Sequence, residues 1–176
     1  MIKILVVYAS GYGSTAETAK QMGKLLTRES VAVTVSQLPV VENLEQYDAI
    51  IVGSPIRYDH WMAAAKAFVK NNSDTLSKMP VAFFFNCLTL AQQTKETEKK
   101  ADQYAEKIIS LNEQIKPLSV GRFGGVLDYT KMPFFLRLIF KAFGSIARLE
   151  AGDYRNWNEI HQWTKDIEVK FIEVLK

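Results

Sequence analysis

A short loop rich in glycine and hydroxyl residues has the residue types and the position of a phosphate-binding loop. It follows the apolar run Ile4-Leu5-Val6-Val7-Tyr8, and an amphipathic helical pattern begins directly after it. Unpaired backbone N–H groups and the positive end of the helix dipole converge at such a junction and attract an anion. The loop has neither the lysine of nucleoside triphosphatase loops nor the G-x-G-x-x-G spacing of dinucleotide folds. We therefore expect a site for the single phosphate of a mononucleotide cofactor, with a simple helix cap as the alternative. The residues of the loop are Ser10, Gly11, Tyr12, Gly13, Ser14 and Thr15.

Two further loops carry groups suited to a planar ring. The first contains Arg57, Tyr58, His60 and Trp61. Tyr58 and Trp61 can stack on a ring and Arg57 can place positive charge beside it; the alternative is that these aromatic residues cover the core. His60 is a candidate proton donor or an orienting group for a substrate carboxylate, so Arg57 and His60 are the candidate catalytic residues. The second loop contains Cys87, for which we favour a small buried residue over a redox-active thiol because no resolving cysteine exists.

Five apolar runs alternate with helical patterns along the chain. The runs cover residues 2–8, 31–36, 49–53, 81–86 and 120–126, and their continuous apolar character indicates strands buried on both faces of a parallel sheet. Helices are expected after the first loop and over residues 61–69 and 95–111. The last helix has an apolar stripe of Trp157, Ile160, Thr164, Ile167, Phe171 and Val174. This alternation predicts a doubly wound α/β fold, in which the loops after strands one, three and four border the ligand site.

Length and composition limit the classes of function. The 176 residues, of which 48% are hydrophobic, suit a single domain spanning residues 1–176. One cysteine excludes an internal disulfide, and the chain runs from Met1 directly into the first strand, so we expect a cytoplasmic protein. The net charge is +3 without a block of basic residues, and the two histidines lack metal-ligand spacing. We therefore expect neither a nucleic acid partner nor a metal site.

Residues 127–156 form an insertion before the last helix, and this length marks a candidate functional segment. Pro133 and Gly144 bracket a helical pattern whose apolar arc is wider than one sheet face can cover. The segment is too short to span a bilayer, but it suits a peripheral membrane interface or the roof of an apolar pocket. Burial against a second copy of the chain in a homo-oligomer is the alternative. The expected membrane contacts are Phe134, Phe135, Leu138, Ile139 and Phe140.

The loop at residues 10–15, the string Gly53-Ser54-Pro55 and the order of elements resemble the flavodoxin superfamily over nearly the whole chain. The resemblance implies a flavodoxin-like sheet of five parallel strands in the order 2-1-3-4-5, with helices on both faces, and bound FMN. It implies that residues 10–15 hold the phosphate. The residues implied to border the isoalloxazine ring are Ser54, Pro55, Ile56, Arg57, Tyr58, Asn86, Cys87, Leu88, Thr89, Leu90 and Ala91.

A narrower resemblance rests on the string Ile56-Arg57-Tyr58-x-His60, on Met79-Pro80 and on the insertion, which look like the flavodoxin-type, menaquinone-dependent protoporphyrinogen IX dehydrogenases. It implies oxidation of protoporphyrinogen IX to protoporphyrin IX in heme biosynthesis, with a membrane quinone (menaquinone) as acceptor, at the inner face of the cell membrane. Basic residues in or beside the insertion would suit anionic lipid or the propionates of a porphyrin. They are Lys131, Arg137, Lys141 and Arg148.

Two departures from the family pattern bear on the alternatives. Tyr12 stands where the phosphate loop of flavodoxins usually has a threonine, and residues 86–91 lack the Gly-Asp-Gln pattern of the electron carriers. The first departure leaves the backbone donors of the loop in place. The second favours an enzyme over a single-electron carrier of the flavodoxin type. That carrier and an FMN-dependent NAD(P)H:quinone reductase are the alternative functions.

Overall fold

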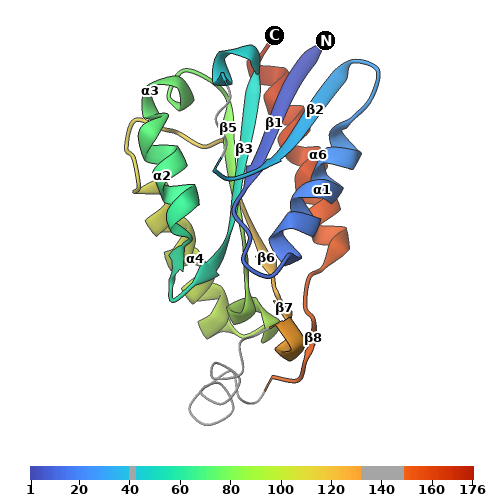
Figure 1. Cartoon of the computed structure of the whole chain (residues 1–176), viewed down its shortest axis with the longest axis vertical. Helices are drawn as coiled ribbons and strands as arrows, with labels where there is room; N and C mark the ends of the chain where they lie inside the picture. Colours follow the sequence, from blue (N-terminus) through green and yellow to red (C-terminus); the bar gives the residue numbers. More distant parts are fainter. Residues whose placement is uncertain (40–42, 132–148) are drawn as a thin grey trace.

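Five parallel strands form the centre of the molecule. A computed structural model describes residues 1–39, 43–131 and 149–176 of the chain. Its main strands are β1 (Ile2–Tyr8), β2 (Val31–Gln37), β3 (Ala49–Arg57), β5 (Val81–Cys87) and β6 (Val120–Gly124). They lie in the order β2-β1-β3-β5-β6 (Figure 1). Because β5 and β6 are the fourth and fifth parallel strands, the predicted order 2-1-3-4-5 is confirmed.

Five helices in the described part of the chain pack on the two faces of this sheet. Figure 1 shows α2 (Ala63–Asn71), α3 (Ser73–Leu76) and α4 (Lys95–Ile109) on one side and α1 (Ser14–Leu26) and α6 (Trp157–Val174) on the other. The continuous apolar strands require this cover, because successive side chains of a strand point to opposite faces. Phe83 and Phe85 join the core under α2 and α4, whereas Phe84 joins the core under α1 and α6.

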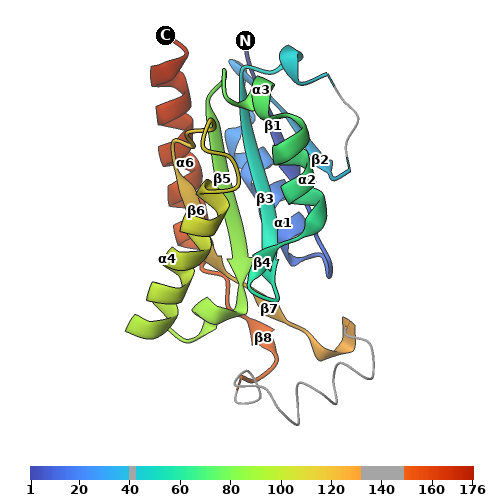
Figure 2. The same cartoon turned by 90° about the vertical axis from the view of Figure 1, so that its left-hand side faces the viewer.

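Short elements gather at the carboxyl ends of the parallel strands. They are β4 (His60–Trp61), antiparallel to β3, the pair β7 (Val126–Leu127) and β8 (Gly152–Asp153), and the 3-10 turns η2 (Leu88–Ala91) and η3 (Tyr129–Lys131). A third 3-10 turn, η1 (Leu44–Gln46), precedes β3 at the other end. Figure 2 shows β4, β7 and β8 at the end of the molecule opposite to both termini.

Several boundaries predicted from the sequence are wrong, and the strand expected over residues 49–53 extends to Arg57. The helix expected over residues 61–69 begins at Ala63, because Trp61 pairs with Ile56 in β4. The strand expected over residues 120–126 ends at Gly124, and Val126 belongs to β7. The helix expected over residues 95–111 ends at Ile109. The helix expected between Pro133 and Gly144, with its membrane contacts, lies outside the described residues.

The apolar stripe predicted for the last helix is correct except at its end. Ile160, Thr164, Ile167 and Phe171 are buried, but Val174 is 57% exposed. Residue spacing identifies one face of a helix, but it does not show where the surface that covers this face ends. The buried carboxylate Glu168 also lies on this face, where Arg28 pairs with it at 2.7 Å.

Phe171 and Val174 give a matched test of this packing. Phe171→Ala should lower the free energy of unfolding by about 3–5 kcal/mol, because it leaves a cavity under α6. Val174→Ala, in the same helix, should change it by less than about 0.5 kcal/mol. Urea titration followed by circular dichroism measures both values. Similar losses in the two variants would contradict the packing described.

Candidate functional site

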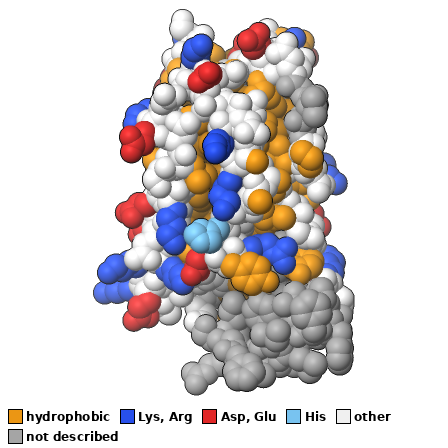
Figure 3. Space-filling model, turned by 60° about the vertical axis from the view of Figure 1, so that its left-hand side comes forward, with side chains coloured by type: hydrophobic (Ala, Val, Ile, Leu, Met, Phe, Trp, Pro, Cys, Tyr) orange, Lys and Arg blue, Asp and Glu red, His pale blue; other side chains and the backbone are white. Residues whose placement is uncertain are grey.

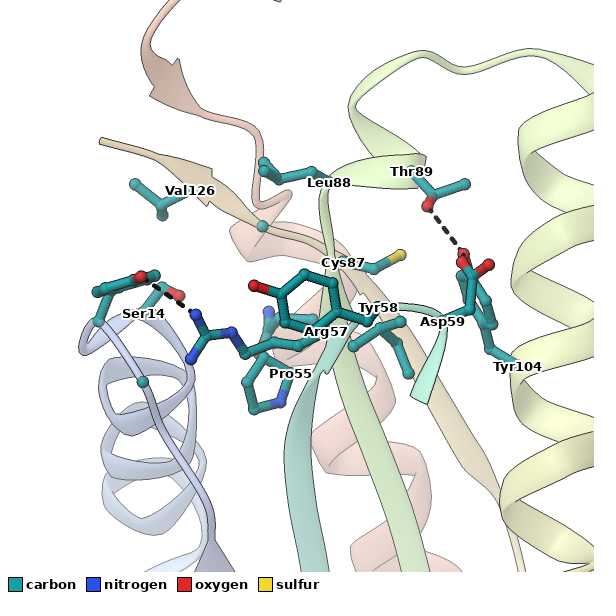
Figure 4. A pocket seen from close by; sticks show the side chains of 15 residues that line it. Ser14, Pro55, Arg57, Tyr58, Asp59, Cys87, Leu88, Thr89, Tyr104 and Val126 are labelled. Atoms are coloured by element: carbon teal, nitrogen blue, oxygen red, sulfur yellow. Dashed lines mark hydrogen bonds between the residues drawn. The ribbon is translucent and has the colours of Figure 1, made fainter. Parts of the chain in front are cut away.

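A cavity of about 340 Å³ lies at the carboxyl edge of the sheet. This volume is in the range of sites for cofactors and small ligands. The three loops expected from the sequence meet there, and they come from β1, β3 and β5 (Figure 4). The lining residues are Gly11, Tyr12, Ser14, Pro55, Ile56, Arg57, Tyr58, Asp59, Asn86, Cys87, Leu88, Thr89, Tyr104, Gly125 and Val126.

The loop between β1 and α1 ends in an uncapped helix start. Gly13 is the N-cap residue with φ 97°, a left-handed conformation that glycine adopts without strain, and no side chain caps the helix. Ser10 Oγ accepts a hydrogen bond from the backbone N–H of Gly13 at 3.1 Å, which shapes the loop. Thr15 is fully buried, and within the described residues its Oγ1 has no hydrogen-bond partner. A buried unpaired hydroxyl beside free helix N–H groups is what a bound phosphate would satisfy.

Arg155 ties this loop to the start of α6. Its side chain is 5% exposed, and it donates from Nη1 to the backbone oxygen of Ser14 at 2.9 Å. Its Nη2 lies 2.7 Å from Glu17 Oε2 and 2.6 Å from Asp153 Oδ2. A second cavity of about 110 Å³ lies here, lined by Tyr12, Gly13, Ser14, Glu17, Val126, Asp128, Lys131 and Arg155. No sequence pattern pointed to Arg155 as a site residue, because Ser14 and Glu17, the partners that connect it to the loop, lie about 140 residues away.

Arg57 links the first and second loops across one side of the main cavity. Its guanidinium packs so closely on Gly11 that a Cβ at this glycine would meet Arg57 Nη1 at 2.9 Å. It donates to the hydroxyl of Tyr12 at 3.1 Å and lies 4.8 Å from the centre of that ring. The tyrosine that departs from the family pattern is therefore a partner of Arg57, and Figure 4 shows the guanidinium directed toward the loop that contains Ser14.

A strained two-residue turn joins β3 to β4. Tyr58 has φ 50° and Asp59 has φ 62°, and this left-handed conformation costs a residue other than glycine about 1–2 kcal/mol. Hydrogen bonds from α4 hold the turn: Tyr104 donates to Asp59 at 2.5 Å and Lys100 Nζ lies 3.2 Å from the same carboxylate. The hydroxyl of Tyr104 also lies 3.4 Å from Thr89 Oγ1 (Figure 4).

The same contacts shift the ionisation of the two residues in opposite directions. The hydrogen bond from Tyr104, followed by the interactions with Lys100, lowers the pKa of Asp59 against a smaller opposing effect of burial. Burial, followed by the hydrogen bond to Asp59, raises the pKa of Tyr104. A carboxylate and a protonated phenol therefore form one wall of the cavity at neutral pH.

The third loop contributes Asn86 and Cys87. Asn86 donates from Nδ2 to the backbone oxygen of Gly124 at 2.9 Å, whereas its buried Oδ1 has no partner within the described part of the chain. Cys87 is 3% exposed, and burial raises the pKa of its thiol to about 11. The thiol is therefore protonated at neutral pH, in agreement with the preferred interpretation of a small buried residue.

Several expected site residues do not line the main cavity. Ser54 is buried, and its Oγ accepts from the backbone N–H of Met62 at 3.0 Å. Trp61 is 3% exposed and packs edge-on against Phe83, so the expectation that Trp61 stacks on a ligand ring is wrong. His60 lines a smaller neighbouring cavity. Ser10, Gly13, Thr15, Leu90 and Ala91 lie beside the cavity in the expected loops, but they are not among its lining residues.

Four lining residues were missed by the sequence analysis. Asp59 could have been found, because it adjoins Tyr58 in the same loop. Tyr104 gives no local signal, since it belongs to the apolar face of α4 and reaches the cavity only when α4 packs on β5. Gly125 and Val126 follow β6 and line the cavity. The sequence predicted one continuous strand over residues 120–126, so the end of β6 at Gly124 was not expected.

Residues 1–39, 43–131 and 149–176 contain no group of three or more His, Cys, Asp or Glu side chains that could hold a metal ion. Within the same ranges, no helix has the length and apolar character needed to cross a membrane.

Curated relatives match nearly the whole chain at modest identity. The protein named protoporphyrinogen IX dehydrogenase [quinone] in Escherichia coli (strain K12) is 26% identical over 176 residues, which covers 94% of each chain. A protein of the same name from Leishmania major is 27% identical over 173 residues, covering 93% of this chain and 74% of its own length.

A family model and a solved structure agree with the observed sheet. Oxidised flavodoxin 2 from Bacillus cereus superposes with a TM-score of 0.58 at 19% identity, covering 97% of this chain and 98% of its own. The model described as flavodoxin domain matches residues 5–151. That segment includes the loop at residues 10–15, the β3–β4 turn and the loop after β5, which together line the cavity. The chain thus belongs to the flavodoxin domain family.

Proposed function

We propose that the protein binds FMN and oxidises protoporphyrinogen IX, with a quinone as electron acceptor. Membership in the flavodoxin domain family supports a flavin cofactor. The observation that carries FMN in particular is the buried hydroxyl of Thr15, unpartnered within the described residues, beside the uncapped start of α1. A phosphate group would accept hydrogen bonds from both, whereas a flavin without phosphate would leave them unpaired.

In this proposal the residues that border the main cavity hold the flavin ring. Residues 10–15 hold the phosphate, and Arg155 fixes the loop from the opposite side by its contact with Ser14. The loops at residues 54–58 and 86–91 border the ring. The free Oδ1 of Asn86 is suited to accept a hydrogen bond from a ring N–H, while the phenol of Tyr58, 78% exposed, is suited to stack on one face.

The reaction follows from the cofactor and from the relatives. A bound flavin accepts a hydride equivalent from a reduced substrate and passes two electrons to an acceptor. The E. coli and L. major relatives carry the name protoporphyrinogen IX dehydrogenase [quinone], which supports a porphyrinogen as donor and a quinone as acceptor. The chain supplies orientation and charge: Arg57 provides a cation at the cavity wall, and His60 stays a prediction as a proton-transferring residue.

A second candidate is an electron carrier without a substrate of its own. The likeness to the Bacillus cereus flavodoxin favours it at the level of fold. The net charge of +3 does not, because a strongly acidic surface would be expected for docking on basic electron-transfer partners. Membrane contact through residues 134–140 and a homo-oligomer also stay predictions, since that segment lies outside the described residues.

The main experiment is anaerobic mixing of FMN-loaded protein with protoporphyrinogen IX. The visible flavin absorption should bleach, porphyrin fluorescence should appear, and a menaquinone analogue should restore the flavin absorption. Dithionite serves as the control that the bound flavin is reducible. A flavin that dithionite bleaches but the porphyrinogen does not would refute the proposed substrate and favour the carrier.

The phosphate site can be tested without any substrate. Thr15→Val should weaken FMN binding about 10-fold or more, because it removes a buried donor to a charged group. Riboflavin, which lacks the phosphate, should bind both proteins equally. Thr18→Val is the matched control: Thr18 is buried in the same helix, but its hydroxyl already donates to the Ser14 backbone oxygen at 3.2 Å. Fluorescence titration measures all affinities, and an equal loss for FMN and riboflavin would contradict a phosphate at Thr15.

The charge of Arg57 should tune the reduced cofactor. A cation at the cavity wall stabilises the anionic two-electron-reduced flavin, so Arg57→Ala should lower the midpoint potential by about 30 mV or more. Arg57→Lys keeps the charge and should retain most of the potential. Tyr12→Phe removes the partner hydroxyl but no charge, and it controls for a change in loop position. Spectroelectrochemical titration gives the potentials, and the proposed role fails if Arg57→Ala matches the wild type.

A further inference from the structure

A smaller cavity adjoins the proposed flavin site on the side of α2 and α4. It has a volume of about 30 Å³ and shares Ile56, Asp59 and Tyr104 with the main cavity. Its remaining lining residues are His60, Trp61, Lys66, Lys107, Ile108 and Leu111. The space is large enough for a small polar group but not for a ring system. A ligand in the main cavity could therefore extend only a substituent into it.

Two cations at this cavity have no ion-pair partner in the part of the chain that the structure describes. Lys66 comes from α2 and Lys107 from α4, and neither makes an ion pair or side-chain hydrogen bond within the described residues. The carboxylate of Asp59, which lines the same cavity, is already bound by Tyr104 and Lys100. Lys107 contributes only a longer-range attraction that helps to lower the pKa of Asp59. Figure 3 shows Lys and Arg side chains, an imidazole and carboxylates close together on one face of the molecule.

The small cavity combines apolar residues with the two lysines. Ile56, Ile108 and Leu111 lie beside the two lysines. Apolar walls with free cations at the rim suit an apolar body that carries a carboxylate on a short chain. A porphyrinogen has this form, because its propionate groups extend from an apolar tetrapyrrole.

The cations near the phosphate loop do not offer the same chemistry. Arg155 is paired with Glu17 and Asp153, and Lys131 lies 3.7 Å from Asp128. Arg57 keeps its charge, but its guanidinium already donates to the hydroxyl of Tyr12 and packs on that ring. Among the described residues that line these cavities, Lys66 and Lys107 are thus the cations left free for an incoming carboxylate.

From these observations we infer that Lys66 and Lys107 form a carboxylate-binding rim that takes a propionate of the tetrapyrrole, with His60 as an additional hydrogen-bonding group. The inference rests on the proposed function for the identity of the ligand. The rim places the propionate beside α2 and α4 and directs the tetrapyrrole toward the main cavity. Substrate therefore approaches the proposed flavin from the side of the β3–β4 turn.

The test compares the product protoporphyrin IX with its dimethyl ester, in which both carboxylates are blocked. Binding of each compound to FMN-loaded protein, in the same dilute detergent, is followed by porphyrin fluorescence. The variant Lys66→Gln/Lys107→Gln should bind the diacid about 10-fold more weakly than the wild type, because it lacks two ion pairs. Its affinity for the ester should be unchanged. The matched control is Lys20→Gln/Lys24→Gln, which removes the same charge from exposed positions of α1 on the opposite face of the sheet.

Each outcome decides the inference. An equal loss for diacid and ester, an equal loss in the control variant, or no binding of either compound by the wild type would overturn it. Turnover of protoporphyrinogen IX by the wild type is measured separately and reports on the proposed reaction. If the wild type turns over the substrate but binding does not depend on the two lysines, the carboxylate-binding rim is refuted and the proposed reaction stands. If binding depends on the lysines but no turnover occurs, the proposed reaction is refuted and the rim stands.

Discussion

Burial of the central strands on both faces is the constraint on which the rest of the molecule depends. Phe83, Phe84 and Phe85 follow one another in β5, and each is at most 1% exposed. Such a run has no solvent-facing side, so helices must cover both faces of the sheet. Parallel strands also place all their carboxyl ends at one edge. The loops after β1, β3 and β5 therefore meet at a single cavity, whatever side chains they carry.

The helices that cover the sheet also fix the shape of the site. α4 packs through Tyr104 against Phe85, and the hydroxyl of the same tyrosine reaches Asp59 in the strained turn after β3. The ring of Tyr104 thus packs in the core, while its hydroxyl holds the turn between β3 and β4. On the opposite face, Arg155 performs the same task for the phosphate loop by binding the backbone of Ser14. Both loops are held from outside by residues far away in sequence.

Polar groups left unpaired are as informative as those that are paired. Most buried polar groups in proteins have partners, because desolvation without a hydrogen bond is costly. Four such side-chain atoms have no hydrogen-bond partner within the described residues, and two of them, Thr15 Oγ1 and Asn86 Oδ1, lie beside the start of α1 and at the edge of the main cavity. Charge shows a similar division: Lys131 and Arg155 near the phosphate loop pair with carboxylates, whereas Lys66 and Lys107 make no ion pair within the described residues. In the described part of the chain these groups have no partner, and a bound ligand would supply one.

The sequence by itself determined the fold class, the parallel sheet and the three loops at its carboxyl edge, because apolar runs and glycine-rich junctions are local signals. It also predicted a role for Arg57 and Tyr58, which line the main cavity. Only the tertiary structure decided that Trp61 belongs to the core and that Tyr104 and Arg155 hold the loops. It alone brought Lys66 and Lys107 to one cavity. These relations depend on how helices pack across the sheet, and contacts between residues tens of positions apart leave no pattern in a single sequence.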